Sequence, residues 1–377
     1  MEKLGIYVHI PFCKKKCKYC DFVSFFCDEN KIDLYFKKLY EEISLKNTEY
    51  LENRKITSIY IGGGTPSYPD SKYIVRILDE LKQKFEISKN VEITIEINPG
   101  TINREKLLAY KKAGINRISI GLQSTQDRLL KIIGRIHNYN EFISTYNQVK
   151  EIGFKNINID LMLALPTQTL EELIDDVNKI ITLNPNHISI YSLILEEGTE
   201  LEEKVKNGIL ELPSEELERE MYWKTKEILE KKYYNHYEIS NFAKKGFESK
   251  HNMDCWNQEE YLGFGLSAHS YINNKRFSNT NDLEKYLKIK NFENNINIHE
   301  IQNKEDKIRE YMILGLRKIN GISISEFERK FRVNPLFYFR FEIDKLTKEK
   351  LIEVDLNSIR LTKKGLDFAN IVFEEFI

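Results

Sequence analysis

The chain has 377 residues, 41% of them hydrophobic and 31% charged, a composition that excludes a disordered chain and leaves room for two or three domains. Its 57 basic and 58 acidic residues give a net charge of −1, so no overall field favours nucleic acid or an anionic membrane, and we predict no nucleic-acid partner. No apolar run reaches the length of a membrane span, and no signal peptide precedes the first motif. We therefore expect a cytoplasmic protein without an integral membrane segment.

Short β-rich runs alternate with amphipathic helical stretches over the first 200 residues. This alternation predicts right-handed βαβ units and a parallel sheet. Six units are too few for a closed eight-stranded barrel, so we predict an α/β fold with a partial (β/α)6 TIM-like barrel, or else a doubly wound sheet. The predicted strands are 6–10, 57–61, 91–96, 117–121, 156–163 and 187–193, and the predicted helices are 32–52, 71–85, 104–112, 140–152 and 170–183.

Polar or glycine residues follow each predicted strand. The carboxyl ends of parallel strands meet at one edge of a sheet or barrel, and that edge is where such enzymes build their sites. We therefore predict the functional site there. The residues concerned are Cys13, Gly62–Pro66, Glu96–Pro99, Gly121–Ser124, Asp160 and Ser192.

The rhythm stops after about residue 200. A long helix is predicted over 215–232, a loop-rich region over 237–275 and a polar linker over 291–303. Three helices (304–318, 323–331 and 334–346) and a hairpin (351–354 with 359–362) then predict a small α+β, winged-helix-like domain, which we interpret as a lid or docking domain. The expected division is a partial barrel with the cysteine loop over 1–200, an extension completing the core over 201–295, and a C-terminal domain over 300–377.

Three of the five cysteines lie within eight residues, as Cys13, Cys17 and Cys20. In a reducing compartment this clustering indicates metal or redox chemistry before disulfides. Three thiolates on one loop can hold three irons of a cubane cluster and leave the fourth without a protein ligand, and an open metal position is typical of a catalytic site. The lysines between the cysteines favour ionised thiols.

Two other interpretations of these cysteines remain open at this point. One is a zinc site formed by the three cysteines and His9, and the other is a set of unrelated thiols. We interpret Cys27 and Cys255 as ordinary free thiols.

The cysteine loop and its surroundings resemble the radical S-adenosylmethionine proteins, and the match extends over nearly the whole chain. Within that family the chain resembles the oxygen-independent coproporphyrinogen III oxidase group and, inside that group, its heme chaperones. The motifs that carry the resemblance are Tyr7–Cys13, Cys20–Phe22, Gly62–Ser67, Glu96–Thr101, Ile120–Ser124, Gly134–His137, Leu165–Thr169, Tyr237–Ala243, His251–Trp256 and Tyr261–Gly265.

The resemblance implies two cofactors at the cysteine loop. The three cysteines would bind a 4Fe–4S cluster, and the amino and carboxylate groups of S-adenosyl-L-methionine would fill the open iron position. Gly63, Gly64 and Thr65 would receive the methionine end through backbone groups. The chemistry implied is one-electron reduction of S-adenosylmethionine, which releases methionine and a 5′-deoxyadenosyl radical. Further implied contacts to S-adenosylmethionine are Tyr7, Tyr19, Glu96, Gln123, Arg135, Asp160 and Ile194.

The group that the chain resembles has two functions. One branch decarboxylates two propionates of coproporphyrinogen III to give protoporphyrinogen IX, and the other binds heme and passes it to an acceptor such as a respiratory enzyme. The decarboxylase pattern has a fourth cysteine two residues after the third, where this chain has Phe22, and an extension ahead of the cluster loop. We therefore predict a heme chaperone, with the decarboxylase as the alternative, and assign no catalytic residue.

The resemblance also implies a heme ligand. His251, followed by Asn252 and Trp256, matches the chaperones' heme-binding motif, although the residue before the tryptophan is Cys255 instead of the usual tyrosine, so thiolate ligation is an alternative. His251 as a hydrogen-bonded loop histidine is the other alternative. A second departure is Thr167, where the family has glycine. The acceptor protein and the oligomeric state, with a homodimer as one option, are left open.

Overall fold

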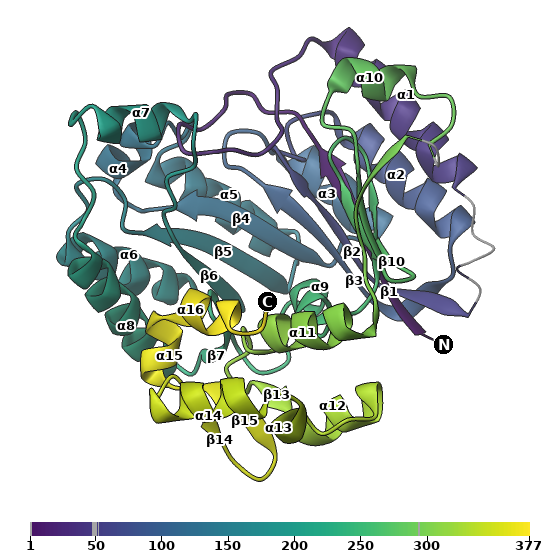
Figure 1. The fold of residues 1–377 in the computed structure, drawn as a ribbon. Helices are drawn as coiled ribbons and strands as arrows, with labels where there is room; N and C mark the ends of the chain where they lie inside the picture. The colour runs from purple at the N-terminus through teal and green to yellow at the C-terminus, as the bar shows by residue number, and fades with distance from the viewer. Residues whose placement is uncertain (1, 47–50, 52, 293–294) are drawn as a thin grey trace.

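The computed structural model of the chain describes every residue except 1, 47–50, 52 and 293–294. A twelve-stranded mixed sheet with the order β12-β11-β10-β9-β1-β2-β3-β4-β5-β6-β8-β7 forms its centre. Neighbouring strands from β1 to β6 are parallel. The sheet curves into a partial barrel, as predicted (Figure 1). These six strands are β1 (Glu2–Ile10), β2 (Arg54–Gly63), β3 (Ile87–Ile97), β4 (Arg117–Gln123), β5 (Asn156–Leu163) and β6 (His187–Ser192).

Helices cover the outside of this barrel. Five of them match predicted helices, although α1 ends at Leu45, earlier than expected, and the short α4 was not predicted. Residues 47–50 and 52 of the α1 prediction lie outside the described residues. Side chains at alternate positions of the strands are isoleucines and leucines that form one core with the helices. The helices are α1 (Glu29–Leu45), α2 (Ser71–Lys84), α3 (Arg104–Ala113), the short α4 (Asp127–Ile132), α5 (Tyr139–Glu151) and α6 (Leu170–Leu183).

The inner positions of the same strands are polar. On β4, Ile118 and Ile120 belong to the core beneath the helices, whereas Arg117 and Ser119 line the cavity inside the barrel. A strand that alternates in this way has one apolar and one polar face. The barrel interior is therefore a chamber for polar ligands rather than a second hydrophobic core.

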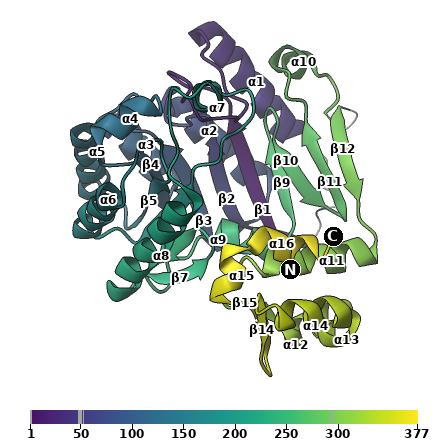
Figure 2. The ribbon, with the colours of Figure 1, turned by 60° about the vertical axis from the view of Figure 1, so that its left-hand side comes forward.

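The region after residue 200 adds strands to both edges of the sheet, and two predictions there are wrong. Residues 237–275 are not a loop-rich region, since they contain three complete strands and a helix, and one of these strands, β9 (Tyr261–Phe264), pairs in parallel with β1. The described part of 291–303 is not a linker, because β12 (Ile296–Ile301) forms the outer edge of the sheet (Figure 2); residues 293–294 of that prediction lie outside the described residues. Its exposed, polar sequence resembles a loop, but pairing with β11 makes it a strand.

The added elements extend both edges of the sheet and pack at both ends of the barrel. The strands are β7 (Asn235–Glu238), β8 (Asn241–Ala243), β9 (Tyr261–Phe264), β10 (His269–Ile272) and β11 (Lys275–Asn279), and the helices are α7 (Glu200–Lys206), α8 (Glu215–Lys231), α9 (Lys250–Trp256) and α10 (Leu283–Lys288). Glu92 on β3 accepts hydrogen bonds from the backbone N–H groups of Lys250 (3.0 Å) and His251 (3.4 Å). Asp254 bonds Lys3 and Thr57, near the starts of β1 and β2. Helix α9 therefore covers the N-terminal end of the barrel.

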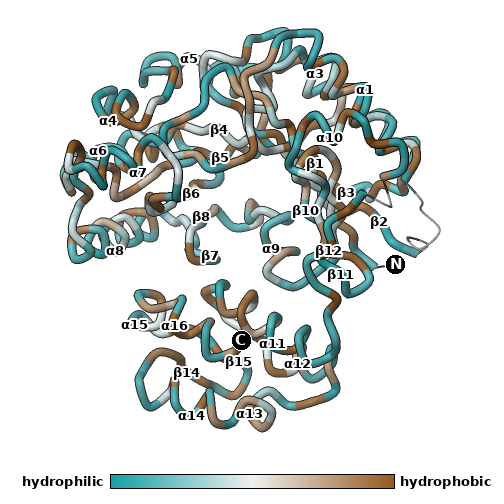
Figure 3. Tube along the Cα trace, turned by 45° about the horizontal axis from the view of Figure 1, so that its top comes forward, coloured by the Kyte–Doolittle hydropathy of each residue, from teal (hydrophilic) through white to brown (hydrophobic). Residues whose placement is uncertain are grey.

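The C-terminal elements form a lobe beside the barrel with its own hydrophobic segments (Figure 3). The predicted single helix over 334–346 is wrong, because Phe339 leaves the helical conformation and separates α13 from α14. No helix among the described residues is long and apolar enough to cross a membrane. The elements are α11 (Lys304–Gly315), β13 (Ile322–Ser323), α12 (Ile324–Phe331), α13 (Pro335–Tyr338), α14 (Arg340–Lys348), β14 (Ile352–Val354), β15 (Ser358–Leu361), α15 (Lys363–Asp367) and α16 (Ala369–Glu374).

Candidate functional site

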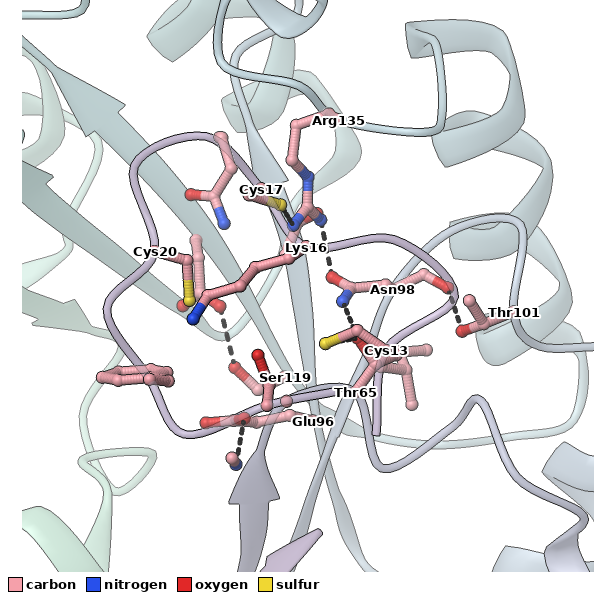
Figure 4. A pocket seen from close by; sticks show the side chains of 18 of the residues that line it. Cys13, Lys16, Cys17, Cys20, Thr65, Glu96, Asn98, Thr101, Ser119 and Arg135 are labelled. Atoms are coloured by element: carbon pink, nitrogen blue, oxygen red, sulfur yellow. Dashed lines mark hydrogen bonds between the residues drawn. The ribbon is translucent and has the colours of Figure 1, made fainter. Parts of the chain in front are cut away.

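A cavity of 410 Å³ occupies the inside of the barrel. The cysteine loop closes it at the carboxyl ends of the strands, and the side chains of β2 to β6 line its walls (Figure 4). Most of the predicted site residues line it together: Cys13, Cys17, Tyr19, Cys20, Gly63, Gly64, Thr65, Glu96, Gln123, Arg135 and Asp160.

Backbone hydrogen bonds hold the cysteine loop over the cavity. The N–H of Cys13 donates to the carbonyl of Phe25 (2.9 Å), which closes the loop on itself. The N–H of Lys18 donates to the carbonyl of Ile133 (3.0 Å), and the carbonyl of Lys18 accepts from Leu201 (2.9 Å). Because these bonds use the main chain, the loop conformation depends little on the intervening lysine side chains.

The cysteine sulfurs face the cavity and already have polar neighbours. The hydroxyl of Thr65 donates to the Cys13 sulfur and the guanidinium of Arg135 donates to the Cys17 sulfur, both at 3.5 Å. Among the described residues, no three His, Cys, Asp or Glu side chains converge on the position of a single metal ion. A cubane cluster binds each cysteine through a different iron, so three separated thiols around one cavity fit it better than they fit one zinc ion.

Burial governs the protonation of these thiols. It raises the pKa of Cys20 to about 11 and raises the pKa of Cys13 above its ordinary value. Both are therefore protonated at neutral pH in the metal-free chain, and metal binding must release their protons. In this protonated form the two thiols are weak nucleophiles, and they can bind a metal once they lose their protons.

His9, the fourth ligand in the zinc interpretation, is not free to bind a metal. Its Nδ1 shares a hydrogen bond with the hydroxyl of Tyr7 (2.9 Å), and its Nε2 bonds the carbonyl of Val23 (2.9 Å). A Cβ at Gly63 would lie 2.8 Å from the His9 ring, so the backbone packs directly on the imidazole. Both ring nitrogens are engaged, and this geometry argues against the zinc site.

The carboxylate of Glu96 lies below the loop, at the end of β3. It accepts hydrogen bonds from the hydroxyl of Tyr60 (2.7 Å) and the N–H of Gly63 (3.3 Å). Burial raises its pKa to about 7, and repulsion by Asp160 adds to this. A carboxyl group with a pKa near 7 can be neutral in the empty site and ionised when it binds a cationic ligand group.

Arg135 and Asn98 connect the cysteine loop to the strand ends. The Arg135 guanidinium donates to the side-chain oxygen of Asn98 (2.6 Å) and to the carbonyl of Gly121, as well as to Cys17. The side-chain amide of Asn98 in turn donates to the hydroxyl of Thr65 (2.9 Å). Arg135 is predicted from the sequence to face a ligand carboxylate, and in this structure its acceptors belong to the protein.

Two further predicted residues lie on β4 and β5. Asp160 accepts hydrogen bonds from Asn158 (2.7 Å) and Ser119 (3.3 Å), and burial raises its pKa. Gln123 adopts a left-handed φ of 76° where β4 ends, a conformation that is uncommon for residues with a side chain. Strain of this kind concentrates at functional sites because the surrounding fold must enforce it.

The structure does not bring every predicted residue to the cavity wall. Ile194 is 67% exposed and does not line the cavity. Tyr7 lies behind the wall, where burial and the charge of Glu96 raise its pKa. Phe22, which replaces the fourth cysteine of the decarboxylase pattern, lines the cavity and is 58% exposed.

His251, the predicted heme ligand, lies at the opposite end of the barrel from the cysteines. Its Nδ1 bonds the hydroxyl of Ser58 (3.2 Å), and its ring stacks on Tyr60 with centroids 5.1 Å apart. Burial lowers its pKa to about 4, so the imidazole is neutral. His251 itself does not line the cavity, but Asn252 and Tyr60 do.

The alternative heme ligand, Cys255, is in a poorer position. Burial raises its pKa to about 12, with the charge of Asp254 adding to the effect, so the thiolate is strongly disfavoured. It does not line the cavity. Trp256 of the same helix stacks with the guanidinium of Arg317 at 4.4 Å, which joins α9 to the C-terminal lobe.

Reasoning from the sequence missed Tyr60 and Arg117. Tyr60 lines the cavity from within β2 and Arg117 from the start of β4, whereas the sequence prediction considered only the carboxyl ends of the strands. A signal exists, because each is a polar or aromatic residue alternating with buried isoleucines, for example Ile59 and Ile61 around Tyr60. In a strand covered by helices, that alternation marks the inner face of the barrel.

Comparisons with known proteins match this architecture. The model of the radical SAM superfamily matches residues 7–180, and the model of the HemN C-terminal domain matches residues 302–368. The solved structure of coproporphyrinogen III oxidase (HemN) from Escherichia coli, described as a radical SAM enzyme, superimposes with a TM-score of 0.87. It covers 100% of this chain and 90% of that one at 26% identity.

Curated relatives are similar over the whole length. The heme chaperone HemW of Lactococcus lactis is 40% identical over 98% of this chain and 96% of its own length. The heme chaperone HemW of Bacillus subtilis is 36% identical over 98% of both chains. With the matched barrel and C-terminal domain, this similarity shows that the chain belongs to the radical SAM superfamily and, within it, to the family of the heme chaperone HemW.

Proposed function

We propose that this protein is a heme chaperone: it binds heme and passes it to an acceptor protein, using a radical S-adenosylmethionine fold. The observation that carries the proposal is the 40% identity to a heme chaperone along 98% of the chain, including the helix with His251. Phe22 at the cavity wall supports it, because the decarboxylase pattern has a cysteine there.

The cofactor end of the proposal concerns the cysteine loop. Cys13, Cys17 and Cys20 would hold a 4Fe–4S cluster, and the polar groups at the strand ends would hold S-adenosylmethionine. When bound, the cluster supplies a single electron to S-adenosylmethionine. Backbone packing supports this assignment, since a Cβ at Gly64 would lie 2.9 Å from the Cys13 sulfur and 2.9 Å from the carbonyl of Phe12. The contacts proposed for S-adenosylmethionine are the predicted residues that line the cavity: Tyr19, Gly63, Gly64, Thr65, Glu96, Gln123, Arg135 and Asp160.

The heme end of the proposal concerns His251. A neutral imidazole is the form that binds iron, and burial keeps His251 neutral. If Nδ1 carries the proton and donates a hydrogen bond to the Ser58 hydroxyl, the lone pair of Nε2 is available to bind iron. Ser58 would then fix the orientation of the ring, as the hydrogen-bond partners of metal-binding histidines do at other metal sites. His251 would then bind the heme iron at the N-terminal end of the barrel, away from the cysteine loop.

The test is an anaerobic titration of the iron–sulfur-reconstituted protein with heme, followed by absorption. We expect saturable, stoichiometric binding that weakens in His251→Ala. His269→Ala is the matched control, because His269 stacks on His299 at 5.3 Å on the outer strands and should not affect binding. No heme binding by the unaltered protein would refute the chaperone.

The second candidate is an oxygen-independent coproporphyrinogen III oxidase, which the TM-score of 0.87 to HemN favours. Anaerobic incubation with coproporphyrinogen III separates the two functions. Formation of protoporphyrinogen IX by the purified protein would establish the decarboxylase and refute a function limited to heme transfer.

We also propose a location, a partner and a domain division for this protein. The chain would work in the cytoplasm, where thiols stay reduced, and its five cysteines are free. The acceptor would be a second protein, with a respiratory enzyme as one candidate, and a homodimer can be tested by sedimentation. We propose the division into a barrel over 1–200, an extension over 201–295 and a C-terminal domain over 300–377, which limited proteolysis would check.

A further inference from the structure

The floor of the cavity contains a buried arginine that the function proposed above does not use. Arg117 is the first residue of β4, is 2% exposed, and lines the cavity from the N-terminal end of the barrel. Asn252 of α9 and Asn158 of β5 line the same cavity. Arg117 is therefore at the end where α9 closes the barrel, far along the strands from the cysteine loop.

Arg117 makes no hydrogen bond or salt bridge among the residues that the structure describes, although its charge acts on Glu96 and Asp160 at longer range. Its Nε is fully enclosed and has no hydrogen-bond acceptor. Arg135, the other arginine of the cavity, has acceptors on Asn98, Gly121 and Cys17. Burying an unpaired guanidinium is costly, so an anion or ordered water must compensate Arg117 in the working protein.

The acidic side chains of the cavity form no salt bridge with Arg117. Glu96 is held by Tyr60 and Gly63, and Asp160 is held by Asn158 and Ser119. Burial raises the pKa of both carboxyl groups, and the positive charge of Arg117 opposes that rise from a distance. The guanidinium of Arg117 therefore has no direct acceptor on these carboxylates and can bind a group of a ligand that fills the cavity.

The groups around Arg117 suit a carboxylate. Asn252 lines the same cavity and carries side-chain N–H donors. The donors of Asn158 and Ser189 are already used, because Asn158 donates to Ser119 and Asp160 and Ser189 donates to Asn158. A guanidinium with neighbouring neutral donors binds a carboxylate through charge-assisted, often bidentate, hydrogen bonds. A neutral or cationic ligand group would not offset the free-energy cost of burying the charge of Arg117.

We propose that Arg117 anchors a carboxylate-binding site at the floor of the cavity, which takes a carboxylate of the ligand that the barrel encloses. A propionate of a tetrapyrrole could supply this group. The methionine carboxylate of S-adenosylmethionine is the other source to test, although it would then lie away from the open iron position assigned to it above. The first source rests on the proposed heme-binding function, and the second requires only the radical SAM family of the chain.

The experiment compares Arg117→Met with the unaltered, iron–sulfur-reconstituted protein in three anaerobic titrations, with heme, with heme dimethyl ester and with S-adenosylmethionine. Loss of a charged hydrogen bond should weaken the relevant ligand by about tenfold or more. Arg104→Met is the matched control, because Arg104 is an exposed arginine on α3 that pairs with Glu151, and it should bind all three ligands normally.

The three titrations identify the source of the carboxylate. If the carboxylate is a propionate, Arg117→Met lowers the affinity for heme and leaves the affinity for the dimethyl ester unchanged. The unaltered protein then binds the ester no more tightly than the variant binds heme. If it belongs to S-adenosylmethionine, only that ligand is weakened. Heme and S-adenosylmethionine that both bind Arg117→Met within about twofold of the unaltered protein would overturn the proposal and leave water as the partner of the arginine.

The design separates this proposal from the function on which it rests. If the unaltered protein does not bind heme, the chaperone fails, and the S-adenosylmethionine arm still decides the role of Arg117. Arg117→Met should fold, because removing a buried unpaired charge relieves its desolvation cost. Arg117→Lys, which retains the charge without the bidentate geometry, is the second variant and should bind the affected ligand between the two extremes.

Discussion

The two ends of the barrel use polar residues differently. At the cysteine end, polar side chains are paired with one another: Arg135 has three acceptors and Glu96 has two donors. At the α9 end, Arg117 is buried without a hydrogen bond at its Nε, and His251 is held through Nδ1 by Ser58. The first end is organised before a ligand arrives, whereas the second depends on a ligand for part of its stability.

The cysteine end can be disrupted without altering the other end. Cys17→Ser removes one of three cluster ligands, and we expect reconstituted protein to lose the visible absorption of the cluster together with its iron and sulfide. Heme binding at His251 should persist, because α9 shares no residue with the loop. Cys255→Ser is the matched control and should retain the cluster; an unchanged spectrum in Cys17→Ser would refute the ligand assignment.

The close packing under the loop gives the next largest effect. Gly64→Ala would place a Cβ 2.9 Å from the Cys13 sulfur and 2.9 Å from the carbonyl of Phe12, so the loop must move. We expect S-adenosylmethionine affinity to fall by about tenfold or more, measured by titration of the reconstituted protein. Gly198→Ala, where a Cβ meets no atom within 4 Å, should keep this affinity despite some backbone strain at φ 76°. Normal affinity in Gly64→Ala would contradict this.

The raised pKa of Glu96 predicts that ligand binding at the cysteine end depends on pH. Since burial raises this pKa to about 7, the carboxyl group is neutral at lower pH in the ligand-free protein. A cationic ligand favours the ionised form, so S-adenosylmethionine affinity should decrease as pH falls below 7, by at most about tenfold per pH unit. Glu96→Gln should bind more weakly and lose this dependence. An equally steep dependence in Glu96→Gln would assign the titration to another group.

The smallest effect concerns Thr167, which stands where the family has glycine. Thr167 has a left-handed φ of 63°, an unfavourable conformation for a β-branched residue. Thr167→Gly would relieve that strain but lose the hydrogen bond that the Thr167 hydroxyl accepts from Arg128. We expect a change in unfolding free energy within about 1 kcal/mol, measured by denaturation, and unchanged ligand binding at both ends. Loss of the cluster in this variant would show that the loop after β5 supports the site.

The barrel and its cysteine end could be predicted from the sequence because their signals are local. The spacing of Cys13, Cys17 and Cys20 lies on one loop, and the strands from β1 to β6 alternate with amphipathic helices. Each strand end carries its polar residue next to a hydrophobic run, so parallel pairing alone brings those residues together. The long helices α6 and α8 were predicted within a residue for the same reason.

The α9 end depended on contacts between distant parts of the chain, which sequence pattern does not specify. Strand β9 pairs with β1 some 250 residues earlier, and β12 is a strand only because β11 provides its hydrogen bonds. The placement of His251 against Ser58, and the lack of a hydrogen bond at the Nε of Arg117, follow from that tertiary arrangement. Local sequence thus determined the cluster loop, the barrel strands and the identity of the family, whereas only the packed structure decided which polar groups share the cavity and which of them lack a partner, because burial and pairing are properties of neighbours in space.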